Sequence, residues 1–175
     1  MRMKRLLGIW LSMGCLLFLS PGCYTLKSTS IPEEMKTISV GFFENNATLV
    51  VPTLSQQFTE ALKDRIRTTT RLSIIAGQGD ASMTGEITDY HIAPVSIQAT
   101  NNNAPPIAGA SVLSITVHVK FVCDPDKKLT KYNFDQSFTK TMNYTGDINS
   151  QEQVLIQAIN KQLIDDIFNK AFNNW

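Results

Sequence analysis

Alternating apolar and polar residues predict the strands of this chain. The clearest run is 111–122, where every second residue is apolar: Leu113, Ile115, Val117, Val119 and Phe121. Alternation with a period of two places these side chains on one face of a sheet and the polar ones on the other. Similar patterns predict further strands at 35–43 (apolar Ile38, Val40 and Phe42), 72–76, 81–100 and 132–142.

The predicted strand at 81–100 is less regular than the others. Its apolar residues change parity near Asp89 to Ala93, which indicates a β-bulge or a bend. Pro94 cannot donate a hydrogen bond to a neighbouring strand, so it favours an edge position.

Two segments have the apolar spacing of amphipathic helices. The first follows Thr53, a predicted N-cap with Gln56 at capping-box spacing, and should end near 68–70; its apolar face is Leu54, Phe58, Ala61, Leu62 and Ile66. The second follows Ser150, with Gln153 at the same spacing, and continues toward Trp175; its apolar stripe is Leu155, Ile159, Leu163 and Ile167.

The order of these elements predicts the fold class. Strand, helix, several strands and helix indicate an α+β domain over residues 35–175. We expect a largely antiparallel or mixed β-sheet of about four to five strands, with two helices packed on one face. The predicted domain is single.

The first 22 residues have the pattern of a signal peptide. Three basic residues within 1–5 precede an uncharged apolar run at 6–19, which is shorter than the roughly 20 residues that span a bilayer. Residues 19–23 resemble a bacterial lipobox, so Cys23 is the predicted lipid-modified residue and 23–34 the lipidated cysteine and tether. Cys15 is the competing candidate, but it would leave 16–19, an apolar stretch, on the mature surface.

Charge and composition exclude several function classes. The chain of 175 residues has 16 basic and 15 acidic residues; removal of 1–22 would leave 13 and 15. Proteins that bind nucleic acid normally carry a clustered basic excess, so no nucleic-acid partner is expected. Neither His91 nor His118 has metal ligands at suitable spacing, so no metal or cofactor is expected.

The sequence offers no recognisable catalytic motif. We interpret the two histidines as surface residues, Cys123 as a half-buried bystander thiol, and Asp165 and Asp166 as part of a solvated helix face. Neighbours on a helix point about 100° apart, so these two carboxylates should not converge. A lipid-anchored enzyme would need carboxylates, or Ser and His, brought together from distant positions in a pocket.

Several segments together resemble the LptE-type lipopolysaccharide-assembly lipoproteins, in the form found in Bacteroidetes. The matching segments, in order, are Cys23 with its lipobox, 38–40, 42–47, 52–55, 58–62, 85–90 and 165–170 with Trp175. The resemblance implies a non-enzymatic lipoprotein, anchored in the outer membrane on its periplasmic side. It also implies that the protein plugs an LptD-type β-barrel and helps to insert lipopolysaccharide.

The resemblance directs attention to two groups of residues as contacts. The segment 101–110 is a candidate barrel-contacting loop between the two longest strands: Asn101, Asn102, Asn103, Pro105, Pro106 and Ile107. Lipopolysaccharide carries phosphates and carboxylates, which lysines bind, so four lysines are candidate contacts unless they are ordinary surface residues: Lys120, Lys127, Lys128 and Lys131. The alternative function is another lipid-anchored periplasmic adaptor of an envelope assembly or secretion machine.

Overall fold

The computed structural model describes residues 31–95, 110–124, 126 and 129–173. Several predictions fall outside these ranges: the signal peptide, Cys15, Cys23, the loop residues 101–107, Lys127, Lys128 and Trp175. Among the described helices, none combines the length and the apolar character needed to cross a membrane.

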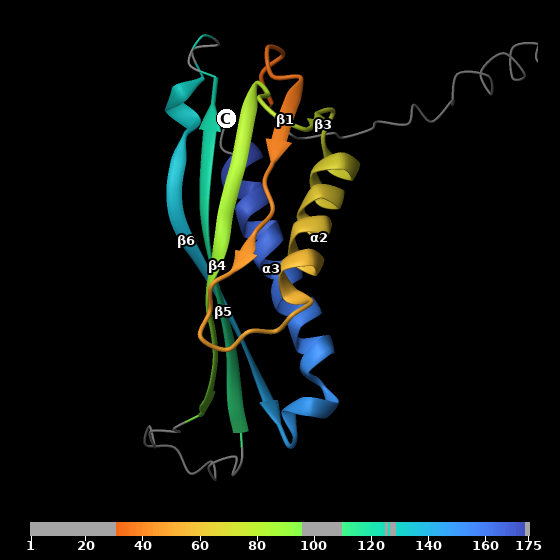
Figure 1. The fold of residues 1–175 in the computed structure, drawn as a ribbon, viewed down its shortest axis with the longest axis vertical. Coiled ribbons are helices and arrows are strands. Elements are labelled where there is room, and N and C mark those ends of the chain that lie inside the picture. The colour runs from red at the N-terminus through yellow and green to blue at the C-terminus, as the bar shows by residue number, and fades with distance from the viewer. Residues whose placement is uncertain (1–30, 96–109, 125, 127–128, 174–175) are drawn as a thin grey trace, which may run out of the picture.

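The described chain forms a sheet with helices on one face (Figure 1). In chain order the elements are β1 (Thr37–Val40), β2 (Glu44–Asn45), α2 (Leu54–Thr69), β3 (Ser73–Ile75), β4 (Ala81–Pro94), β5 (Ala110–Cys123), the 3-10 helix η2 (Thr130–Tyr132), β6 (Phe134–Thr145), the 3-10 helix η3 (Ile148–Ser150) and α3 (Glu152–Phe172).

The sheet is mixed, with strand order β3-β1-β4-β5-β6 and with β2 paired to β4. β1 runs parallel to both β3 and β4, whereas β4, β5 and β6 form an antiparallel meander. The predicted α+β class is therefore confirmed, with six strands rather than four to five. The additional strand is the two-residue β2, which lies just after the predicted strand at 35–43.

The core lies between the sheet and the two helices. All five apolar residues of the predicted β5 face are fully buried, as is most of the α3 stripe. The rings of Phe121 on β5 and Phe172 on α3 meet edge-on, with their centroids 5.8 Å apart. α3 covers β5 and β6, and α2 packs beside α3. Both helices therefore contact the same apolar layer.

The predicted irregularity of β4 is a bulge. The register between β4 and β5 shifts between Ile87 and Asp89, so Tyr90 returns to the buried face. The Tyr90 hydroxyl donates to Glu152 Oε1 at 2.8 Å, which ties β4 to the first turn of α3. Burial, together with this carboxylate, raises the pKa of Tyr90.

The prediction that Phe42 belongs to the apolar face of the strand at 35–43 is wrong. β1 stops at Val40, which pairs with Met83, and the chain pairs again at Glu44 with Glu86. Between these two pairs, the segment from Val40 to Glu44 contains one residue more than the stretch of β4 beside it. Such a one-residue slip moves every later side chain to the opposite face of the sheet. Phe43 is therefore fully buried, and Phe42 is 58% exposed.

Both helix starts differ from the predicted capping boxes. Thr53 is the N-cap of α2, but its side chain makes no capping hydrogen bond. Ser150 belongs to η3, and its hydroxyl donates to the carbonyl of Asp147 instead of capping α3. Ala61 is exposed, because its side of α2 faces α3 across a groove and not the sheet.

The one free cysteine in the described ranges, Cys123, is fully buried at the end of β5 and is predicted to make folding sensitive to alkaline pH. Burial raises its pKa from 9.0 to about 11. Between these values an unfolded thiol ionises while the folded one does not. Ionisation of the thiol in the unfolded state should therefore lower the free energy of unfolding by about 2 kcal/mol at pH 11, and should have no effect below pH 9.

Urea unfolding at pH 8 and at pH 11 measures this effect. A Cys123→Ala variant should lose less stability over that interval than the parent, even though its stability at pH 8 is lower. Equal losses in the two proteins would contradict the prediction.

Candidate interaction surface

The face of the sheet opposite the helices is uncovered in the described structure (Figure 1). We call it the open face and define it by the side chains of β4, β5 and β6 that alternate with the core residues. Hydroxyl, amide and charged groups dominate it: Ser82, Thr84, Glu86, Asp89, His91, Ser114, Thr116, His118, Lys120, Asp135, Ser137, Thr139, Thr141 and Asn143.

Hydrogen bonds between neighbouring strands order the centre of the open face. Thr116 on β5 lies opposite Thr139 on β6, and their hydroxyl oxygens are 2.9 Å apart. The hydroxyl of Thr88, the bulged residue of β4, donates to the carbonyl of Thr116 at 3.3 Å. These pairs leave a hydroxyl-rich surface that can donate and accept further hydrogen bonds.

His118 has two partners on β6 and is not simply a solvated side chain. Its Nε2 lies 2.7 Å from Asp135 Oδ1, and its Nδ1 lies 3.2 Å from Ser137 Oγ. Ser, His and Asp thus come together here, but on an open strand surface where the His118 and Asp135 side chains are 37% and 54% exposed. The groove described below lies between the helices and not at this cluster.

The two described lysines among the proposed lipopolysaccharide contacts lie at one end of the sheet. Lys120 is exposed near the end of β5, opposite Asp135 in the register, although the carboxylate of Asp135 contacts His118 instead. Lys131 lies in η2, with its Nζ 4.7 Å from the centre of the Tyr132 ring. Their positions leave both lysines exposed to solvent.

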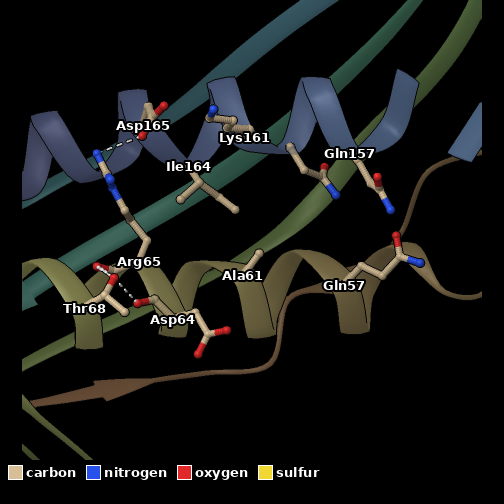
Figure 2. Close-up of a pocket in the computed structure, with 10 residues that line it drawn as sticks. Gln57, Ala61, Asp64, Arg65, Thr68, Gln157, Lys161, Ile164 and Asp165 are labelled. Atoms are coloured by element: carbon tan, nitrogen blue, oxygen red, sulfur yellow. Dashed lines mark hydrogen bonds and ion pairs between the residues drawn. The ribbon is translucent and has the colours of Figure 1, made fainter. Parts of the chain in front are cut away.

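A groove of about 520 Å³ lies between α2 and α3 (Figure 2). Arg65 closes one end: its Nη2 lies 3.0 Å from Asp165 Oδ1, and its guanidinium lies over the ring of Phe168. The next carboxylate, Asp166, instead pairs with Lys140 of β6 at 2.7 Å. The two acids therefore point to different elements, as their helical spacing predicts, but each has an ion-pair partner.

The described residues contain no group of three or more His, Cys, Asp or Glu side chains that could hold a metal ion. One candidate feature that sequence reasoning does not single out is the open face as a whole. Its signal is present in the polar halves of the strand alternations, but the sequence does not show that this face stays uncovered.

The comparison with known families decides the identity. The family model for lipopolysaccharide assembly, LptE, matches residues 35–171. The chain belongs to the LptE family. LptE proteins are non-enzymatic, so this chain is a lipopolysaccharide-assembly lipoprotein and not an enzyme.

A solved structure with a TM-score above 0.5 shows the same fold as this LptE chain at low sequence identity, and a second structure is similar. A hypothetical protein from Chlamydia trachomatis has a TM-score of 0.51 and 8% identity, over 80% of this chain and 99% of that one. Rare lipoprotein B from Shewanella oneidensis has a TM-score of 0.48 and 12% identity, over 77% of this chain and 90% of that one. No curated protein sequence matches the LptE chain.

Proposed function

We propose that this LptE-family chain plugs the lumen of an LptD-type β-barrel in the outer membrane and supports the insertion of lipopolysaccharide. The observation that carries the proposal is the open face. The lumen of an outer-membrane barrel is polar, and a face of hydroxyl, amide and charged groups can exchange its water for hydrogen bonds to such a wall. The groups at its centre, such as Thr116 and Thr139, have the required chemistry.

The dimensions of the sheet also support a plug. β4 and β5 contain 14 residues each. At a rise of about 3.3 Å per residue they extend roughly 45 Å, compared with about 25 Å for the apolar band of an outer-membrane barrel. A domain of this length would fill the height of the barrel, and the connection between β4 and β5 would reach one rim. Residues 101–107 belong to that connection and are the proposed barrel-contacting loop.

The anchor and the lipopolysaccharide contacts complete the proposal. Cys23 would carry lipid and hold the protein on the periplasmic side of the outer membrane. The described chain begins close to the C-terminal end of α2, where Arg71 donates to the carbonyl of Ile31 at 2.8 Å. Lys120 and Lys131, with the neighbouring Lys127 and Lys128, would bind phosphates of lipopolysaccharide.

A pull-down through a tag after Trp175 tests the barrel partnership. The parent should recover an LptD-type barrel, identified by mass. Deletion of residues 102–107 should weaken recovery, and so should Thr141→Glu, because it places an unpaired charge on the open face. Gln162→Glu adds the same charge on an exposed position of α3 and serves as the matched control.

Unchanged barrel recovery by both the deletion and Thr141→Glu would refute the proposed contacts. Recovery of a different envelope complex by the parent would favour the alternative adaptor function.

Membrane fractionation tests the anchor separately. Cys23→Ser should move the protein from the membrane fraction to the soluble fraction almost completely, because stable attachment would lose its acyl chains. Cys15→Ser should leave the protein in the membrane fraction. The reverse result would assign the anchor to Cys15.

A further inference from the structure

The free edge of β6 is the longest unpaired strand edge in the described structure. β6 contains 12 residues and pairs with β5 along its whole length without a register shift. It is the last strand of the sheet order, and no described strand pairs with its other side (Figure 1). A long regular edge presents a row of main-chain donors and acceptors, which another strand can pair with.

The other edges of the sheet are protected, and β6 lacks the same protection. β3, at the opposite end of the sheet, has only three residues. The part of β4 that extends beyond its pairing with β2 contains the bulge at Thr88 and ends at Pro94. Short strands, bulges and prolines are the usual devices that prevent strand addition. β6 has neither a bulge nor a proline.

The charges of β6 also leave its edge open. Its one lysine, Lys140, pairs with Asp166 of α3 at 2.7 Å, and its one carboxylate, Asp135, lies 2.7 Å from His118. Both charged groups therefore have partners within the chain. An added strand would therefore meet no unpaired charge on β6. It would need no charged residue of its own to neutralise one.

Each face beside the edge offers a surface that an added strand could continue. On the helix side Phe134, Phe138 and Met142 pack against the core, alternate with Gln136 and Lys140, and stay partly exposed. On the open face Asp135 is followed by hydroxyl and amide residues: Ser137, Thr139, Thr141 and Asn143. A strand that alternates apolar with hydroxyl or amide residues would cover the partly exposed apolar side chains and extend the polar surface.

A single extended segment fits this edge better than a second copy of this chain. α3 lies over the helix side of β6, where Asp166 contacts Lys140 and Lys170 lies 6.0 Å from the centre of the Phe134 ring. Two β6 strands paired about a twofold axis would be roughly 4.8 Å apart, which would bring the two copies of α3, each packed on β5 and β6, close to each other. A single extended segment carries no helix.

We infer that the free edge of β6 binds one extended segment of another polypeptide by strand addition. The segment has apolar residues at alternate positions facing α3 and hydroxyl or amide residues facing the open side. Main-chain hydrogen bonds to β6 hold it, and the alternating side chains select it. This site is separate from the proposed contacts with the barrel wall, so either can fail without the other.

A peptide with the required alternation tests the site on the full-length lipoprotein in detergent. The probe is a synthetic, fluorescently labelled copy of residues 111–122 with an added lysine at each end. Binding is followed by fluorescence anisotropy, and the position by amide hydrogen exchange. Two control peptides carry N-methyl groups on one or the other alternate set of amides, which blocks main-chain pairing along one edge while the side chains stay the same.

The parent peptide should bind and slow exchange in β6 but not at residues 88–94. One N-methylated peptide should bind at least tenfold more weakly, and the other should remain within about threefold of the parent. No binding, equal affinities of all three peptides, or protection confined to another element would each overturn the inference. Pull-down of the barrel is a different measurement, so its result does not affect this test.

Discussion

A Gly85→Ala variant is expected to lose about 3 kcal/mol or more of folding free energy, or to fail to fold. A Cβ atom at this position would lie 2.1 Å from the carbonyl oxygen of His118 and 2.6 Å from Cε1 of Phe43. The first contact is with backbone, so β4 and β5 would have to separate to relieve it. Overpacking of a closed core usually costs 1–3 kcal/mol, and a backbone clash lies at the upper end of that range or beyond.

Urea unfolding followed by circular dichroism measures the loss. Thr84→Ala is the control, because Thr84 precedes Gly85 on β4 but is exposed on the open face. A surface change of this kind should stay within about 0.5 kcal/mol. If Gly85→Ala were as stable as Thr84→Ala, β4 and β5 would have to be further apart than described.

Phe43→Ala is expected to destabilise the protein by about 3–5 kcal/mol. The Phe43 side chain is fully buried, and its ring centre lies 5.2 Å from that of Phe58 on α2. Its main-chain N–H donates to the buried hydroxyl of Thr59 at 3.0 Å, a bond that alanine can keep. The loss therefore measures the cavity left beside Phe58.

Phe42→Ala is the matched control for this measurement. Phe42 is the same residue type, one position earlier, and 58% exposed, so its replacement should change stability by less than about 1 kcal/mol. The stability of both variants is measured by the same urea titration. The opposite order, with Phe42→Ala the more damaging, would mean that the slip between β1 and β2 is absent.

Long regular patterns in the sequence predicted the fold well. β5 alternates over its length, and its predicted apolar face, from Leu113 to Phe121, is buried. The parity change in β4 predicted the bulge beside Asp89. Side chains of a strand alternate between its two faces, so apolar residues that change parity stay on the buried face only if the strand has a bulge or bend. The α3 stripe likewise identified its buried face.

Short-range signals failed where tertiary contacts decide the outcome. The pattern at Ile38 and Val40 extends naturally to Phe42, but the slip at 41–43 depends on how the chain pairs with β4, which no local pattern encodes. Ser150 has a suitable spacing for an N-cap of α3, yet its hydroxyl bonds to the carbonyl of Asp147 within η3. A serine side chain can cap a helix or bond to the main chain of a nearby turn, so spacing alone does not select between the two.

The candidate surface was predictable only in part. The polar halves of the strand alternations supplied its residues, and Lys120 lies on that face as its position in β5 indicates. The contacts of His118 with Asp135 and Ser137 depend on the register between β5 and β6, because these residues are 17 and 19 positions apart in the chain. Sequence periodicity gives the face of each residue but not its neighbour across the strands.

The position of β1 between β3 and β4 in the sheet has a consequence for the order of assembly. Thr37 pairs with Ser73 and Ile38 with Ala81, so both neighbours of β1 come much later in the chain. During synthesis the N-terminal part emerges first. β1 therefore stays unpaired until α2, β3 and the start of β4 have followed it, whereas β5 and β6 can each pair with the strand that has just preceded them.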